Sequence, residues 1–134
     1  MEAKDILIID DDKVLTKSLQ AILQEHQYNV DVANDTEAGM EKFNSHKPDL
    51  LILDVMMASD LEGHKIAHKI KSDPDNKDLP ILVITGMMDT LGVNIREAFE
   101  GVDKLPSLTM LDKPFKTDEL LSKVEEMISG VREE

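Results

Sequence analysis

Short, unbroken apolar runs alternate along this chain with longer segments in which apolar residues recur at helical spacing. The runs at residues 6–9, 49–54 ("DLLILD") and 81–85 ("ILVIT") have no polar residue in their middle. That pattern is typical of strands buried on both faces of a parallel sheet. Residues 28–33 ("YNVDVA") alternate like a strand with one polar face, and residues 108–111 ("LTML") are the last strand candidate.

The segments between these runs have the 3.6-residue period of helices. The sequence predicts helices over residues 13–27, 36–46, 63–72 and 117–129, and a more weakly patterned one over 94–100. Predicted helix caps are Asp12, Asp35 and Thr117, and Gly130 is the predicted stop of the last helix. Five strands alternating with five helices indicate an α/β fold in which helices cover both faces of a parallel sheet.

The chain has 134 residues, which suits one domain, and it shows no internal repeat or linker. We therefore expect a single domain over residues 1–134. Because only four residues follow Gly130, we expect no output domain.

Charge and composition narrow the range of partners. Fifteen basic and 28 acidic residues give a formal charge of −13, which repels nucleic acid and anionic membranes. There is no cysteine for a disulfide or a thiolate metal site. The N-terminal apolar run is too short for a signal peptide. These features predict a cytoplasmic protein that binds neither nucleic acid nor membrane.

Chemically useful residues stand at the carboxyl ends of the predicted strands, where open parallel sheets bind their ligands. They are Asp10, Asp11 and Asp12 after the first strand, Asp54 at the end of the third, Thr85 with Gly86 at the fourth, and Lys113 with Pro114 after the fifth. Carboxylates gathered in one cleft repel one another unless a cation neutralises them. Mg²⁺ suits one or two carboxylates together with a phosphoryl oxygen and waters. An aspartate can act as a phosphoryl nucleophile, while a lysine and a hydroxyl bind phosphoryl oxygens.

Four segments, "ILIIDDD", "PDLLILDVMM", "PILVITG" and "LDKPF", stand in the order in which they occur in response-regulator receiver domains. The chain resembles this family over essentially its whole length, and most of all the chemotaxis-receiver-like, stand-alone members. The resemblance implies a flavodoxin-like, doubly wound, five-stranded sheet of strand order 2-1-3-4-5.

The resemblance also implies a role for each matching position. Asp54 would be the phosphoacceptor. Asp10, Asp11, Asp54 and the backbone carbonyl of Met56 would hold Mg²⁺, with Asp11 a more direct ligand than Asp10. Thr85 and Lys113 would contact the phosphoryl group. The protein would then be no enzyme, but a phosphoacceptor that assists its own phosphorylation and dephosphorylation.

The partners implied are a sensor histidine kinase or a histidine phosphotransfer protein as donor, and a downstream protein target. Signalling would proceed by protein–protein contact or by onward phosphotransfer in a phosphorelay. The protein would be a monomer or a phosphorylation-dependent dimer.

This sequence departs from the family pattern at several positions. Met110 occupies the switch position, where receivers usually have Tyr or Phe. Ala58 replaces a common Pro, Gly63 lies one position late, and the stretch from Thr85 to Lys113 is longer, with an extra segment at residues 101–107. Met56 and Met87 would flank the path of the hydrolytic water, where neither side chain activates it. We expect a long-lived aspartyl phosphate and an unusual docking surface.

Other interpretations of these residues remain. Asp12 is better explained as a helix cap than as a metal ligand. His64 and His68, four residues apart, are better explained as a solvated helix face than as a metal site, and His26 and His46 as ordinary residues near helix ends.

Three other functions compete with the receiver. A receiver-like docking module would bind a partner without being phosphorylated. An aspartate-nucleophile phosphatase would need an acid where Met56 stands. A nucleotide- or flavin-binding protein would need a phosphate loop in place of "DDD".

Overall fold

The computed structural model describes residues 3–54, 66, 69–70, 72–76, 79–85, 108–112 and 115–129, with the side chains of 54, 85, 108–110, 112 and 129 excepted. Its strands are β1 (Asp5–Ile9), β2 (Asn29–Ala33), β3 (Leu50–Asp54), β4 (Ile81–Thr85) and β5 (Leu108–Asp112). Its helices are α1 (Lys13–Glu25), α2 (Thr36–Ser45), the short 3-10 helix η1 (Pro74–Asn76) and α6 (Thr117–Ser129).

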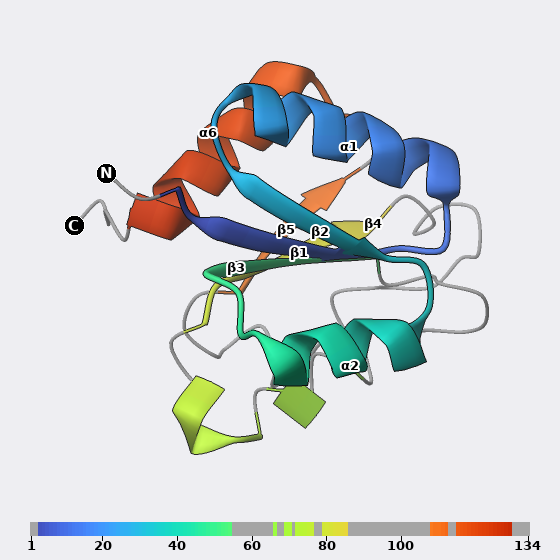
Figure 1. Cartoon of the computed structure of the whole chain (residues 1–134). Helices are drawn as coiled ribbons and strands as arrows, with labels where there is room; N and C mark the ends of the chain where they lie inside the picture. The colour runs from blue at the N-terminus through green and yellow to red at the C-terminus, as the bar shows by residue number, and fades with distance from the viewer. Residues whose placement is uncertain are drawn as a thin grey trace, which may run out of the picture.

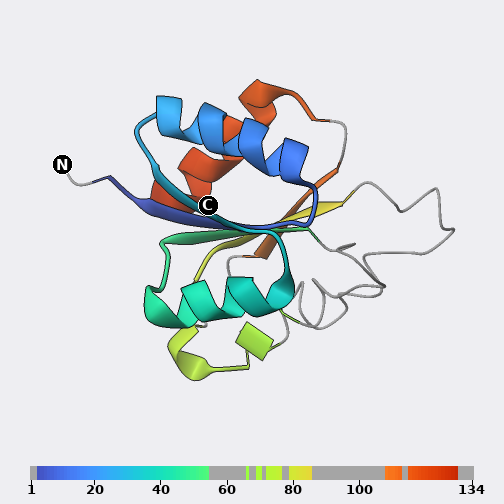
Figure 2. The same ribbon diagram turned by 45° about the vertical axis from the view of Figure 1, so that its right-hand side comes forward.

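The five strands form one parallel sheet in the order β2-β1-β3-β4-β5. Helices α1 and α6 cover one face of this sheet, and α2 covers the other, together with η1 (Figures 1 and 2). The predicted fold class and strand order are therefore confirmed.

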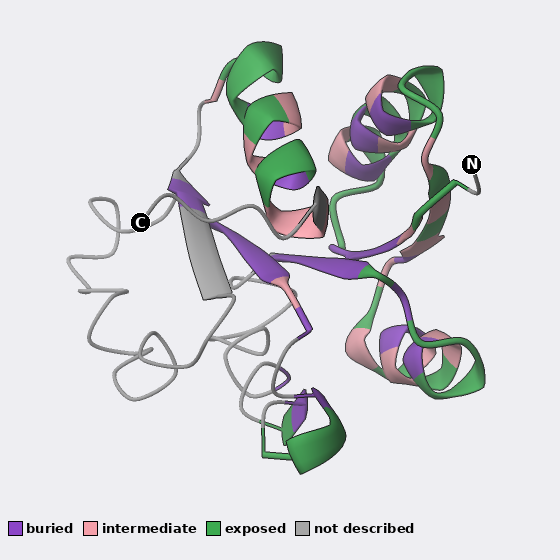
Figure 3. Cartoon of the chain, turned by 90° about the vertical axis from the view of Figure 1, so that its left-hand side faces the viewer, coloured by how far each residue is buried: buried purple, intermediate pink, exposed green. Residues whose placement is uncertain are grey.

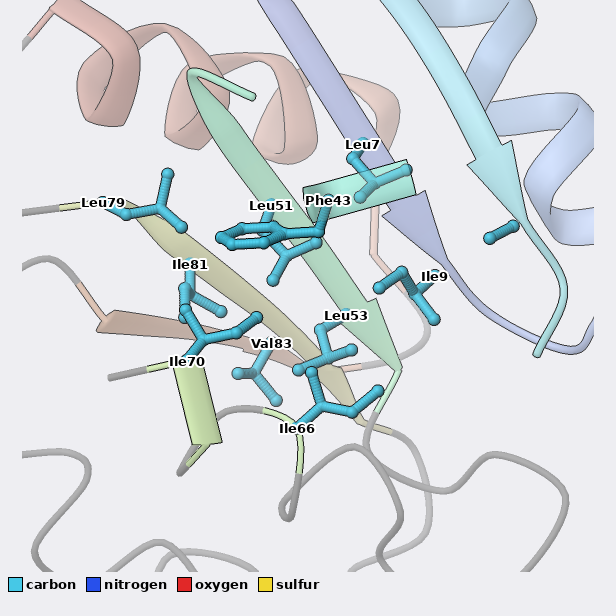
Figure 4. Packing of buried hydrophobic residues seen from close by; sticks show 11 residues of the cluster. Leu7, Ile9, Phe43, Leu51, Leu53, Ile66, Ile70, Leu79, Ile81 and Val83 are labelled. Atoms are coloured by element: carbon cyan, nitrogen blue, oxygen red, sulfur yellow. The ribbon is translucent and has the colours of Figure 1, made fainter. Parts of the chain in front are cut away.

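The central strands are apolar on both sides because each face of the sheet has its own core. Alternate side chains of β1, β3 and β4 point to opposite faces. One cluster, on the α2 face, contains Leu7, Ile9, Ala33, Phe43, Leu51, Leu53, Ile66, Ile70, Leu79, Ile81 and Val83 (Figure 4). The other, on the α1 and α6 face, contains Ile6, Ile8, Leu19, Leu23, Leu50, Ile52, Leu82, Ile84, Leu111, Leu120 and Val124. Figure 3 colours the described central strands as buried, which agrees with apolar clusters on both faces.

Helix α1 begins at its predicted cap and ends earlier than the hydrophobic pattern predicts. The Asp12 carboxylate accepts hydrogen bonds from the N–H groups of Val14 and Leu15, both at 3.0 Å. The helix ends at Glu25 rather than at residue 27, because Gln27 takes a left-handed backbone conformation with φ 72°. The N–H of Gln27 then bonds the Gln24 carbonyl, and the following N–H bonds the carbonyl of Leu23. This pattern is the Schellman motif.

Helices α2 and α6 lie where the sequence predicted helices, but details at their ends differ from the prediction. Asp35 caps α2 as predicted, accepting from the Ala38 N–H at 2.7 Å. Thr117, predicted as a cap, is instead the first residue of α6, and the Glu119 carboxylate accepts from the Lys116 N–H before it at 2.9 Å. Such a reciprocal bond from the third helical position satisfies a donor that would otherwise be unpaired.

The remaining helix predictions fall largely on undescribed residues. Of the predicted helix 63–72, Ile66, Lys69 and Ile70 are helical and Ser72 lies in a turn. The helix predicted over 94–100 and the stop at Gly130 lie outside the described residues.

Gly39 allows α2 to lie unusually close to β1. A Cβ atom at this buried position would come within 2.5 Å of Cδ1 and 2.8 Å of Cγ1 of Ile9, which is itself fully buried. Only the absence of a side chain permits this approach. Helix α2 is thereby packed directly against the end of the strand that leads into Asp10.

Candidate functional site

The carboxyl edge of the sheet brings together the strand ends on which the sequence predicted chemistry. The pairing of β1 with β3 matches Ile9 with Leu53, so Asp10 and Asp54 are the next residues on two adjacent strands. Neighbouring strands lie about 4.8 Å apart. Asp54 in turn pairs with Ile84, and Thr85 is the next residue on β4. The backbone therefore places Asp10, Asp54 and Thr85 in one row along this edge.

Asp10 is held firmly at the start of the loop between β1 and α1. Its side chain and backbone are 1% exposed. Its N–H donates to the Ala33 carbonyl at 3.1 Å, which extends the β1–β2 pairing by one residue. One oxygen of its carboxylate accepts from the Asp12 N–H at 2.9 Å. A buried carboxylate so constrained keeps a fixed position at the end of the strand.

The next two acids have different environments and different roles. Asp11 is exposed at the same turn. Asp12, also exposed, uses its carboxylate to cap α1. The prediction that Asp12 is a helix cap is confirmed.

The donor set at this edge fits Mg²⁺. Asp10 and Asp11 supply carboxylate oxygens from one turn, and Asp54 stands at the end of the adjacent strand. A small divalent cation prefers such hard oxygen ligands. Asp10 is buried and Asp11 is exposed, which suits a site at the rim of the sheet that a phosphoryl donor can reach.

Several predicted site residues lie outside the described part of the structure. For Asp54, Thr85 and Met110 the backbone is described and the side chain is not. Entirely outside are Met56, Ala58, Gly63, His64, His68, Gly86, Met87, residues 101–107, Lys113 and Pro114.

The strand-end geometry agrees with what comparison with known proteins shows. Residues 6–125 match the family of response regulator receiver domains. The chain belongs to that family. As a receiver domain it is a phosphoacceptor of two-component signalling, and the recognition made from the four sequence motifs is confirmed.

Known receivers resemble this one in sequence and in structure. The response regulator MprA of Mycobacterium avium is 33% identical over 129 residues, which cover 96% of this chain and 53% of the relative. The chain thus spans about half the length of the curated relatives that it matches. The signal receiver domain of a histidine kinase from Syntrophus aciditrophicus superposes with a TM-score of 0.77 at 26% identity, covering 98% of this chain and 95% of that one. A CheY-like receiver from Methanospirillum hungatei shares the fold, with a TM-score of 0.80, 22% identity and 96% of each chain covered.

Two polar residues beside the receiver site were missed by the sequence analysis. The side-chain amide of Asn34 donates to the backbone carbonyl of Asp10 at 2.8 Å and contacts the Thr16 hydroxyl at 3.4 Å. Thr16, which is 3% exposed, donates its hydroxyl to the Lys13 carbonyl at 3.1 Å. The only signal in the sequence was an Asn directly after a predicted strand, a position common in turns.

A second polar network lies at the opposite, amino end of the sheet. His46 at the end of α2 forms an ion pair with Asp5, with 2.8 Å between Nε2 and Oδ2. The other oxygen of Asp5 accepts from the Asn29 amide at 3.2 Å, and the N–H of Asp5 donates to the Asp49 carboxylate at 2.8 Å. His46 lies directly after α2, as expected of a residue near a helix end, and no pattern in the sequence indicated that its ring also connects α2 to the first strand.

This ion pair should make the free energy of unfolding depend on pH. The hydrogen bond with Asp5, and then the charge of Asp5, raise the pKa of His46 above its ordinary 6.5. The bonds from His46 and then Asn29 lower the pKa of Asp5 below 3.8. The His46 contribution is complete below pH 6.5 and is lost as the pH rises through its raised pKa. The Asp5 contribution is present above pH 3.8 and is lost as the pH falls through its lowered pKa.

We therefore expect His46→Gln to lower the free energy of unfolding most between pH 3.8 and 6.5, and to have little effect well above that window. Urea unfolding of both proteins across this range measures the difference. The matched control is His26→Gln, because the ring of His26 contacts the Ile22 carbonyl and forms no ion pair with an acid among the described residues. A His46→Gln deficit that stayed constant from acid to alkaline pH would contradict this expectation.

A hollow of about 310 Å³ adjoins this amino-end network, between β1, β2 and α2. Its charged lining residues are already in ion pairs, Lys42 with Asp31 and His46 with Asp5. We therefore assign it no ligand. In the described part of the chain, no helix has both the length and the apolar character needed to cross a membrane.

Proposed function

We propose that Asp54 accepts a phosphoryl group from a phosphohistidine, with Mg²⁺ held by Asp10, Asp11, Asp54 and the Met56 carbonyl. The observation that supports this proposal is the register of the sheet, which places Asp10 and Asp54 at the ends of adjacent strands with Thr85 one residue further along the next. The membership of the chain in the receiver family supports the same assignment.

The transfer breaks the P–N bond of the phosphohistidine and forms a P–O bond to one carboxylate oxygen of Asp54. The histidine leaves with the electron pair of the broken bond. Bound Mg²⁺ would supply positive charge that offsets the repulsion between the carboxylates and the incoming phosphoryl oxygens. Lys113 would neutralise a phosphoryl oxygen, and the Thr85 hydroxyl would donate a hydrogen bond to another.

The donor in this proposal is a sensor histidine kinase or a histidine phosphotransfer protein. The new charge on Asp54 would draw Thr85 and Lys113 towards it and change the surface near β5 and α6, where Met110 stands. The signal would then leave by contact with a downstream protein or by onward transfer of the phosphoryl group.

The test is intact-mass measurement of the whole chain after incubation with acetyl phosphate, with and without Mg²⁺. We expect a gain of one phosphoryl group with Mg²⁺ and none after the metal is removed by a chelator. Restoring Mg²⁺ should restore the gain, which serves as the control for damage by the chelator. If no phosphoryl group is gained with Mg²⁺, even from a phosphorylated histidine kinase, the proposal is wrong and a phosphorylation-independent docking module becomes the better interpretation.

A further inference from the structure

The connections β1–α1 and β2–α2 lie next to each other at the carboxyl edge of the sheet (Figures 1 and 2). A side chain joins them. The Asn34 amide, from the β2–α2 connection, donates to the backbone carbonyl of Asp10 at 2.8 Å. Asn34 is half-buried, so this hydrogen bond is partly shielded from competing water.

The carbonyl that Asn34 binds belongs to the peptide unit between Asp10 and Asp11. A peptide unit is planar, so fixing its carbonyl also fixes the direction in which the chain enters Asp11. The peptide unit on the other side of Asp11 is fixed as well, because the Asp12 N–H donates to the Asp10 carboxylate at 2.9 Å. Both peptide units that flank Asp11 therefore have their orientation set by hydrogen bonds.

We propose that Asn34 is a positioning residue for the Mg²⁺ site, acting by orienting the peptide unit that joins Asp10 to Asp11. This inference rests on the proposed function, since it assumes that these two aspartates bind the cation. In this role Asn34 acts through the backbone and would not itself be a ligand of the metal. Its hydrogen bond sets the backbone on which the two carboxylates are carried.

The contact of the same amide with Thr16 extends this role to α1. The Thr16 hydroxyl lies 3.4 Å from the Asn34 nitrogen and donates to the Lys13 carbonyl in the first turn of the helix. Asn34 is thus connected to both ends of the turn that carries Asp11. Groups that orient metal-binding residues in this way usually affect metal affinity strongly.

The chain contains a matched control at the other end of the same strand. Asn29, at the start of β2, donates its side-chain amide to Asp5 at the start of β1, at 3.2 Å. Asn34 follows the end of β2 and donates to Asp10 after the end of β1. Each asparagine bonds the aspartate 24 residues before it, and only one of the two pairs lies at the metal-binding edge.

The experiment is isothermal titration of the whole chain with MgCl₂, with urea unfolding of each variant as a parallel measurement. We expect Asn34→Ala to weaken Mg²⁺ binding about tenfold at a temperature where it is fully folded. Asn29→Ala should also have a lower free energy of unfolding, and it should bind Mg²⁺ like the wild type. If Asn34→Ala does not fold, Asn34→Ser, whose side chain is too short to reach the carbonyl, is used and should show the same weakening.

The outcomes separate this inference from the proposal on which it rests. Asp11→Asn should abolish Mg²⁺ binding, because the family resemblance makes Asp11 the more direct of the two ligands. If it does, and the folded Asn34 variant still binds Mg²⁺ like the wild type, the positioning role is wrong and the metal site stands. Equal weakening in the Asn34 and Asn29 variants would also overturn it, because a general loss of rigidity would then explain both. If the wild type does not bind Mg²⁺, or Asp11→Asn binds it unchanged, the metal site and the role of Asn34 both fail.

Discussion

Asp54→Asn should remove phosphoryl incorporation entirely, both from acetyl phosphate and from a phosphorylated histidine kinase. An asparagine has the shape of the aspartate, so the strand end of β3 should be preserved. It has no carboxylate oxygen to attack phosphorus, and no other residue is expected to take that role. Intact mass after incubation with donor and Mg²⁺ measures the result directly.

Asp49→Asn is the matched control, because Asp49 precedes the same strand at its amino end. Its carboxylate accepts from the Asp5 N–H at 2.8 Å, and the carbonyl oxygen of an asparagine can accept the same bond. We expect this variant to be phosphorylated like the wild type. Phosphoryl incorporation that persisted in Asp54→Asn would mean that a different residue is the acceptor.

Ile8→Ala should lower the free energy of unfolding by about 2–5 kcal/mol. Ile8 is 0% exposed in the second strand of the sheet order and belongs to the core beneath α1 and α6. Removing its outer carbons takes away apolar burial and leaves a cavity between β1 and the two helices. Because the chain has no tryptophan, urea unfolding is followed by far-ultraviolet circular dichroism.

The control for this substitution is Val14→Ala in the first turn of α1. Val14 is 77% exposed, so its side chain contributes little apolar burial. Alanine also has the higher helix propensity, and we expect a change within about 0.5 kcal/mol. A loss at Ile8 no larger than that at Val14 would show that the core beneath α1 and α6 is not closely packed.

Sequence patterns predicted the elements of this fold well because each depends on nearby residues. Apolar runs marked the buried strands, and Asp12 and Asp35 marked two helix starts through hydrogen bonds to their own helices. The end of α1 was missed, because a left-handed glutamine at residue 27 carries no composition signal. The strand order came from the family resemblance and not from the pattern.

The contacts that were missed join residues far apart in the chain. Asn34 meets Asp10 across 24 residues, and His46 meets Asp5 across 41. Both depend on how the strands are aligned, and the apolar pattern of β1 and β3 does not determine that alignment. The candidate site could be predicted as a set of strand ends, whereas the groups that hold those ends in place could not.

The two-sided core affects how the chain avoids pairing its strands in the wrong register. Where only one face of a sheet is buried, a slip of one residue exposes the apolar side chains and is strongly disfavoured. A one-residue slip of β3 would instead move Leu51 and Leu53 from one buried layer into the other, where they would remain covered. Burial of apolar side chains alone therefore discriminates poorly between the correct register of β3 and a register shifted by one residue.

Polar residues at the amino end of the sheet favour the correct register of β1 and β3. The N–H of Asp5 donates to the Asp49 carboxylate, and the N–H of Asp49 donates to the Asp5 carbonyl. These two bonds fix the register of β1 and β3 where the strands begin. Five residues later, about 16 Å away at the usual rise of a strand, the same alignment puts Asp10 beside Asp54. The spacing of the two aspartates at the carboxyl edge of the sheet is therefore set, in part, by a pair of aspartates at the amino edge.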